Sequence, residues 1–153
     1  MRFHIISRLT PAEVDQAFAL IQLEAPELSL AAWRQFARAA GGGKPPSSKP
    51  APAGLVAVKD ARNYMAGLCA YRRTRAFRHG ATLTVDCFVA LDFLHTQGAA
   101  DHLLRHLDET AAALGCTAIE ITLARQETRL IDQFRTAGHA LEGVLLCKML
   151  PAC

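Results

Sequence analysis

The residues with the clearest capacity for chemistry lie at a corner between an apolar run and an amphipathic helix that ends at Gly115. The corner consists of His95, Thr96, Gln97, Gly98, Ala99 and Ala100. Glycine and alanine leave backbone N–H groups accessible at the positive end of a helix, and such groups bind phosphate. Small residues also occur at ordinary strand-to-helix turns, so the corner is equally consistent with a phosphate cradle and with a structural turn.

Two other groups of polar side chains are candidates for binding. The first is a basic cluster that consists of Arg72, Arg73, Arg75, Arg78 and His79. It could meet an acidic substrate or a nucleotide phosphate, but a solvated hairpin tip is the preferred interpretation. The net charge of +3 is small and Phe77 is the single aromatic residue in the cluster, so we expect no nucleic-acid partner.

The second group is a pair of histidines, His102 and His106, which lie one helical turn apart. This spacing can hold a metal ion, but the sequence offers no third ligand nearby. The pair therefore indicates a solvated helix flank, and we expect no metal site.

The composition is that of one globular domain covering residues 1–153, since 51% of residues are apolar and 20% are charged. Five scattered cysteines, an odd number, indicate buried reduced thiols rather than disulfides. The first residues interleave charged and apolar types, which indicates neither a signal peptide nor a membrane span. We expect a cytoplasmic protein with no membrane partner.

The elements before the basic cluster are predicted from caps and breakers. Residues 3–8 have strand character, and Thr10 with Glu13 forms a capping box around Pro11, the expected first residue of a helix. A second helix is expected from Ser29. Residues 41–54 are rich in glycine and proline, so they are predicted to form a flexible loop inserted in the single domain.

The remaining elements complete an α/β (α+β) fold. Three β-rich runs, 55–58, 64–71 and 82–90, predict an antiparallel meander. After them come the helix to Gly115, a strand at 118–123, a short helix at about 127–137 and a last strand at about 139–149. The order β-α-α-β-β-β-α-β-α-β predicts a mixed, mostly antiparallel central sheet flanked by helices.

This order, with the unit from Thr82 to Gly115, resembles the GNAT superfamily of acetyl-coenzyme A dependent acyltransferases over almost the whole chain. The family's pyrophosphate loop has the pattern Arg/Gln-x-x-Gly-x-Gly/Ala, and His95, Gly98 and Ala100 stand at the matching positions. The family's last helix ends in an apolar-Tyr-x-x-x-Gly-Phe signature. Here Gly138 matches the glycine, while Phe134 replaces the tyrosine and His139 the phenylalanine.

The resemblance implies that acetyl-coenzyme A is the cofactor. Residues 95–100 would bind its pyrophosphate, with His95 a weaker anion partner than arginine. The pantetheine arm would lie beside Phe88, Val89 and Ala90, where the fourth strand of the family splays from the fifth. Glu127 stands where an asparagine often contacts the cofactor, and Phe134 also falls on the cofactor-binding part of the last helix.

Asp86 is the catalytic candidate that the resemblance suggests, because some relatives carry a glutamate four residues before the position of Ala90. A carboxylate there can deprotonate the attacking amine. We expect Asp86 on the same strand face as Phe88. Equally, it can be a polar residue on an exposed face or one that pairs with a nearby arginine. Phe134 cannot act as the acid that a tyrosine hydroxyl supplies in many relatives.

Two functions follow from these residues. The first is transfer of an acetyl group to a primary amine of an unidentified small molecule or protein. The second is a catalytically silent module that binds coenzyme A or regulates, suggested by His95, Glu127 and Phe134. Residues 144–150 suit a sheet between two subunits of a homodimer and equally suit a buried strand.

Overall fold

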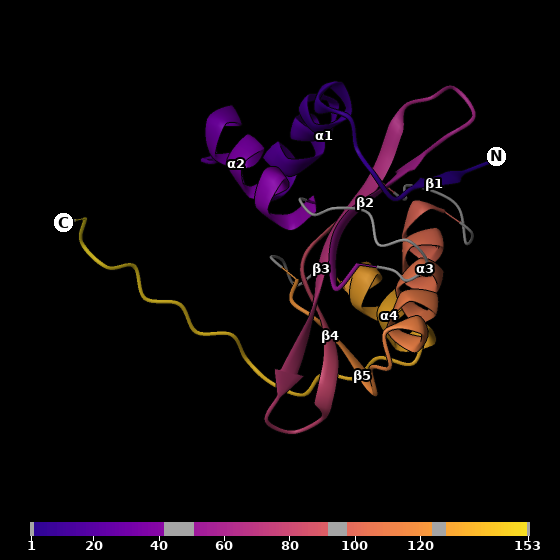
Figure 1. Ribbon diagram of the computed structural model, residues 1–153, viewed down its shortest axis with the longest axis vertical. Coiled ribbons are helices and arrows are strands. Elements are labelled where there is room, and N and C mark those ends of the chain that lie inside the picture. The colour runs from indigo at the N-terminus through magenta and orange to yellow at the C-terminus, as the bar shows by residue number, and fades with distance from the viewer. Residues whose placement is uncertain (1, 42–50, 92–97, 124–127, 153) are drawn as a thin grey trace. The chain divides into compact units, whose positions relative to one another are not determined.

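Five strands form one mixed sheet in the order β1-β2-β3-β4-β5 (Figure 1). The computed structural model describes residues 2–41, 51–91, 98–123 and 128–152. The strands are His4–Ile6 (β1), Ala53–Lys59 (β2), Met65–Ala76 (β3), Gly80–Ala90 (β4) and Ala118–Ile121 (β5). Neighbours pair antiparallel except β4 and β5, which are parallel. The predicted fold class is therefore confirmed.

The first two helices begin where the sequence predicts. Thr10 Oγ1 accepts from Glu13 N at 3.2 Å and Glu13 Oε1 accepts from Thr10 N at 3.0 Å, so the capping box starts α1 (Pro11–Glu24). Ser29 Oγ accepts from Ala32 N at the start of α2 (Leu30–Gly41). Trp33 of α2 is 1% exposed, and its Nε1 donates to Val14 O at 2.7 Å, which joins the two helices.

Helices cover the two faces of the sheet differently. Helices α1 and α2 lie on one face, and α3 (Ala99–Ala113) lies on the other (Figure 1). Beneath α1 and α2 the sheet contributes a row of apolar side chains to the core, which comprises Leu55, Ala57, Leu68, Ala70 and Val89. These side chains alternate along their strands with residues of the opposite face, as a sheet buried on both faces requires.

Gly115 closes α3 as predicted, since it directly follows the C-cap residue Leu114 and has a φ of +71°. A positive φ is strained for residues with a Cβ atom, so glycine suits this position. Arg73 of β3 donates from Nε to Leu114 O at 3.0 Å. This contact places a cation at the negative end of the helix, which fixes the end of α3 to the sheet.

Residues 1–123 and 124–153 form two compact units. In the second, α4 (Thr128–Thr136) is followed by Gly138 with φ +99°. The predicted strand at 139–149 is wrong, because residues 139–152 have no regular secondary structure. A strand forms only when its backbone groups find a ladder partner, and the described residues provide none for this segment. The single-domain assignment stays a prediction.

The ends of the predicted loop at 41–54 also differ from the structure. Gly41 is the last residue of α2, and Ala53 and Gly54 belong to β2, where they pair with Arg72 and Tyr71. Residues 42–50, which make up most of the predicted loop, lie outside the described residues. Pairing with β3 therefore extends β2 into a segment whose alanine and glycine predict no strand.

The cysteines differ in burial. Cys69 is fully buried and its thiol is free, as predicted, while Cys87 and Cys116 are partly buried. Cys147 is exposed, which corrects the prediction of a buried thiol there. Across the described ranges, no helix is both long and apolar enough to cross a membrane.

Candidate functional site

An irregularity in the β3–β4 ladder occurs at Asp86. Ala70 pairs with Cys87 and the next residue, Tyr71, pairs with Val85, so Asp86 is an extra residue in β4. An insertion of this kind is a β-bulge, which bends a strand and reorients its side chains. The sequence carries no sign of it, because the predicted strand is apolar on both sides of the aspartate.

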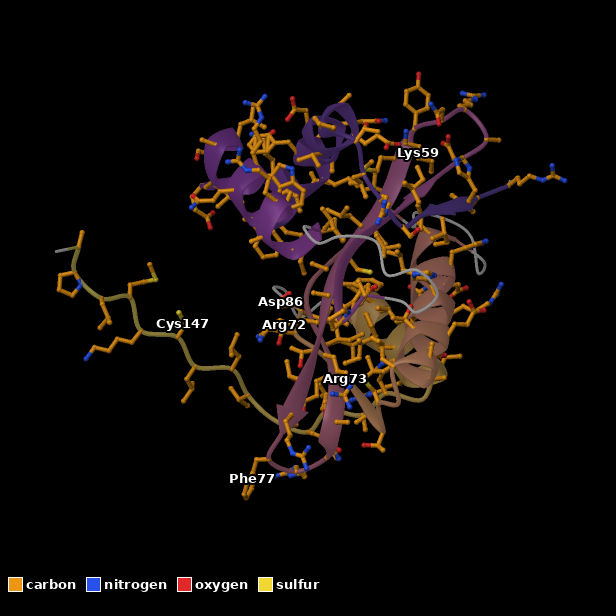
Figure 2. The ribbon with its side chains drawn as sticks, in the orientation of Figure 1. Lys59, Arg72, Arg73, Phe77, Asp86 and Cys147 are labelled. Carbon is orange, nitrogen blue, oxygen red and sulfur yellow. The ribbon has the colours of Figure 1, made fainter. Side chains whose placement is uncertain are left out.

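The bulge changes the face on which Asp86 lies. Its Oδ2 is 3.6 Å from Nε of Arg72, which shares its face with Ala70 of the core beneath α1 and α2 (Figure 2). Phe88 pairs with Cys69 and belongs to the opposite face. The expectation that Asp86 and Phe88 share a face is therefore wrong, because the extra residue breaks the two-residue period of the strand.

Asp86 and Arg72 are both accessible. The side chains are 42% and 58% exposed, so the pair is a weak surface contact rather than a buried ion pair. This contact matches the alternative interpretation of Asp86 as a residue that pairs with an arginine. It leaves the carboxylate open to a ligand from the α1 and α2 side of the sheet.

Cys87 lies next to this carboxylate and is partly covered by the core beneath α1 and α2. Burial raises the pKa of its thiol to about 12, and the negative charges of Asp86 and Glu24 add to the shift. The thiol is therefore protonated and unreactive at neutral pH. Glu24, the last residue of α1, is thus close enough to raise the pKa of the Cys87 thiol. No pattern in the sequence predicts this proximity.

The ladder between β4 and β5 ends just before the bulge. Its last pair is Val85 with Ile121, and Thr122 N donates to Val85 O at 3.1 Å. On the other side of β4, Leu91 N donates to Ala66 O, so the polar backbone groups of Ala90 point away from β3. The described part of the chain thus shows β4 continuing from Asp86 to Ala90 beyond its pairing with β5.

The N-terminus of α3 lies beside the end of β4. Gly67 pairs with Ala90, and a Cβ atom added at Gly67 would lie 3.2 Å from Ala99 Cβ and 3.1 Å from Leu103 Cδ1. Only glycine lets the first turn of α3 pack this closely on β3. A glycine inside a strand run is the signal in the sequence that could have indicated this close approach.

The cap of α3 suits an anion. Gly98 is the N-cap, with no side-chain cap hydrogen bond, and Ala99 and Ala100 follow it. His102 N donates to Gly98 O at 3.3 Å, and His102 Nδ1 lies 3.0 Å from the same oxygen. Small residues at a helix N-terminus fit a pyrophosphate, which N–H groups and the helix dipole bind.

Several predicted site residues are not placed at this corner. His95, Thr96, Gln97 and Glu127 lie outside the described residues. Phe134 belongs to the second unit, where it is buried and its ring meets His139 edge-on at 5.3 Å. Of the predicted cofactor residues, the structure places Ala90 and Ala99 near each other, on either side of Gly67. Phe88 and Val89 precede Ala90 in β4, and Gly98 and Ala100 flank Ala99 at the start of α3.

The basic cluster lies at the β3–β4 hairpin, as the preferred interpretation expects. Phe77 at its tip is fully exposed (Figure 2), and the four arginines are exposed. Arg73 donates to Leu114 O at the end of α3, and Arg72 contacts Asp86. Among the residues with described positions, no three histidine, cysteine or acidic side chains gather in a way that could hold a metal ion.

Comparisons with known proteins support the fold. No family model and no curated protein matches the chain in sequence. In structure it is similar to AAC(6')-Iy solved with the bisubstrate analogue CoA-S-monomethyl-acetylneamine (TM-score 0.77, 10% identity, 99% of this chain and 100% of that one). It is also similar to a GNAT family acetyltransferase of Staphylococcus aureus (0.69, 13%, 98% and 100%).

A further similar structure is a transcriptional regulator of Bacillus halodurans C-125 (TM-score 0.76, 15% identity, 97% of this chain and 100% of that one). At these identities the similarity establishes a shared fold, on which different functions occur. The function must therefore be argued from the residues of the site.

Proposed function

We propose that this chain, whose fold is that of the GNAT acetyltransferases, transfers an acetyl group from acetyl-coenzyme A to a primary amine. The observation that carries the proposal is the position of the α3 N-terminus beside the end of β4, which depends on Gly67. A helix N-terminus and a strand edge thus lie together. Coenzyme A contains a pyrophosphate and an extended amide arm, which these two features match.

The residues that would hold the cofactor follow from this match. The backbone N–H groups at Gly98, Ala99 and Ala100 would bind the pyrophosphate, and the outward polar groups of Ala90 would pair with the amide arm. Bound acetyl-coenzyme A supplies an activated acetyl group as a thioester. His95, Thr96 and Gln97 remain predicted parts of the same pyrophosphate loop, and Glu127 and Phe134 remain predicted cofactor contacts.

Asp86 would accept the proton of the amine. The amine attacks the thioester carbonyl carbon in its neutral form, so the C–N bond forms and the C–S bond breaks, with its electron pair leaving on sulfur. The exposed carboxylate can take the ammonium proton directly or through one water molecule. Phe134 has no hydroxyl group, so solvent protonates the departing thiolate in this scheme.

A binding experiment tests the cofactor assignment. In Gly98→Asp the carboxylate would cap α3 and add a negative charge where the pyrophosphate binds, whereas Gly98→Asn would add a neutral cap of the same shape. We expect calorimetric titration with acetyl-coenzyme A to give at least about 10-fold weaker binding for the aspartate variant than for the asparagine variant. Thermal unfolding of both variants checks that they fold. Failure of the unmodified protein to bind at millimolar acetyl-coenzyme A would refute the proposal.

A kinetic experiment tests the role of Asp86. Release of free thiol is followed across a panel of amines, and Asp86→Asn should lower kcat/KM about 100-fold while leaving the calorimetric Kd for acetyl-coenzyme A unchanged. Asp108→Asn, at an exposed carboxylate of α3, is the matched control and should change neither value. Binding without turnover of any amine would instead identify a catalytically silent module.

A further inference from the structure

Arg72 lies on the same face of the sheet as Asp86. In the β3–β4 ladder it pairs with Thr84, and it follows Ala70, a residue of the core beneath α1 and α2, by two positions. Side chains two residues apart share a face of a strand, and directly opposed residues of neighbouring strands do so too. The bulge brings Asp86 to this face, with Oδ2 3.6 Å from Arg72 Nε (Figure 2). A cation thus stands beside the proposed proton acceptor.

The contact with Asp86 leaves the hydrogen-bond donors of Arg72 unused. Another pair in the chain shows the alternative, since Arg34 donates from Nε and Nη2 to the two carboxylate oxygens of Asp15, each at 2.8 Å. A separation of 3.6 Å is too long for a hydrogen bond. Among the residues whose positions are described, no acceptor hydrogen-bonds to the Arg72 side chain. Its planar fork of N–H groups is therefore available to a ligand.

The two charges indicate the chemistry of that ligand. A guanidinium group binds a carboxylate through two parallel hydrogen bonds, and a carboxylate binds an ammonium group. Because Arg72 and Asp86 are adjacent, a ligand that meets both must carry its own carboxylate next to its amino group. An α-amino acid carries the two groups on one carbon atom and matches the pair.

Glu24 makes the cation necessary for such a ligand. The negative charges of Asp86 and Glu24 both raise the pKa of the Cys87 thiol, so both carboxylates lie near Cys87. Glu24 is also the last residue of α1, where the helix dipole is negative. These negative charges would repel the carboxylate of a substrate, and Arg72 would offset them.

We propose, resting on the acetyl transfer proposed above, that the acceptor is an α-amino acid and that Arg72 determines this specificity by binding its carboxylate. The amino nitrogen attacks the thioester carbonyl carbon, the C–N bond forms and the C–S bond breaks. The products are an N-acetylamino acid and coenzyme A. The ammonium group loses two protons: one passes through Asp86 to solvent, and the other balances the proton that solvent gives to the departing thiolate.

Paired substrates test the specificity. Release of free thiol by the full chain is measured with a panel of α-amino acids, each beside its carboxamide, which keeps the amino group and the side chain but lacks the negative charge. The best amino acid should exceed its carboxamide at least about 30-fold in kcat/KM. Arg72→Gln should lower kcat/KM about 100-fold for the amino acid and less than about 3-fold for the carboxamide, which reverses the preference.

Two further variants separate binding of the carboxylate from a structural role. Arg75→Gln removes the same charge three residues along β3, on the opposite face where Arg75 pairs with Ala81, and should change neither value. Arg72→Lys keeps the charge without the planar fork and should recover about 10-fold of the loss for the amino acid. Thermal unfolding checks that all three variants fold. An equal loss for both substrates in Arg72→Gln would overturn the specificity role.

Calorimetry separates this specificity from the transfer itself. Amino acids of the panel are titrated into the full chain saturated with coenzyme A, and binding should weaken at least about 10-fold in Arg72→Gln. Turnover of carboxamides as fast as of amino acids, or faster turnover of aminophosphonates, would overturn the amino acid assignment and keep acetyl transfer. Binding that depends on Arg72 without any release of thiol would refute acetyl transfer and support the carboxylate site.

Discussion

Lys59 is a buried cation whose position depends on one carboxylate. It lies at the end of β2 with its side chain 6% exposed, and its Nζ is 2.8 Å from Oε2 of Glu13 (Figure 2). The hydrogen bond from Lys59, and then the backbone N–H of Thr10, lower the pKa of Glu13. The same glutamate therefore caps α1 and neutralises a charge in the sheet beneath it.

This pair predicts a dependence of stability on pH. Because the pKa of Glu13 is lower in the folded state than in the unfolded state, its contribution is complete above the ordinary glutamate pKa and is lost as pH falls through the folded value. Glu13→Gln should cost about 2 kcal/mol at pH 7 and flatten the pH profile below about pH 5, measured by urea unfolding. Asp15→Asn, at an exposed pair with Arg34, should cost much less. Equal pH profiles for Glu13→Gln and the unmodified chain would contradict this account.

The sequence predicts the local conformation of single residues well, but it predicts poorly which residues lie next to them in space. The capping box at Thr10 and the glycine end at Gly115 follow from short-range rules and are confirmed. The face of Asp86 does not follow from such rules, because one extra residue in β4 is visible only when the pairing with β3 is known. The contact of Asp86 with Arg72 matches one of the two interpretations, and the catalytic role of Asp86 stays a proposal.

At the scale of elements, Gly67 determines how α3 sits on the sheet. Its missing side chain lets Ala99 and Leu103 approach β3, opposite Ala90 of β4. The order of elements up to α4 was predictable from periodicity and caps. The final strand was not, since apolar β-prone residues pair only where a partner strand exists, and that partner is not encoded in the segment itself.

A larger side chain at Gly67 should therefore affect both stability and binding. Gly67→Val should lower the free energy of unfolding by about 1–3 kcal/mol, since overpacking shifts the first turn of α3. The affinity for acetyl-coenzyme A should fall as well, because the N–H groups at Gly98 and Ala99 move with that turn. Gly41→Ala, where an added Cβ would lie 3.5 Å from Leu55 Cβ, an ordinary van der Waals contact, is the control. Unchanged stability and affinity in Gly67→Val would contradict the close approach.

At the scale of the whole molecule, residues 1–123 contain the proposed anion site, the strand edge and Asp86, while Phe134 belongs to the second compact unit. The resemblance to GNAT acyltransferases predicts that this phenylalanine stands where many relatives use a tyrosine as general acid.

Restoring the hydroxyl group tests that role in the complete protein. Phe134→Tyr should raise kcat several-fold with little change in KM, because a phenol can protonate the departing thiolate in the transition state. Phe77→Tyr adds the same group at the exposed hairpin tip and should leave both constants unchanged. An unaltered kcat in a Phe134→Tyr variant that folds normally would place Phe134 away from the reacting atoms.

The bulge at Asp86 also determines which single residue can be deleted from β4 without disturbing the rest of the strand. Removal of any one residue from a regular strand inverts the facing of every side chain on one side of the gap. Removal of Asp86 alone would instead make Val85 and Cys87 consecutive, so that they pair with the consecutive residues Tyr71 and Ala70 in a regular ladder. When single codons of β4 are deleted in turn, the variant without Asp86 should therefore keep a cooperative melting transition, and the variant without Phe88 should not. A loss of activity in the Asp86 deletion would then reflect the missing carboxylate and not misfolding.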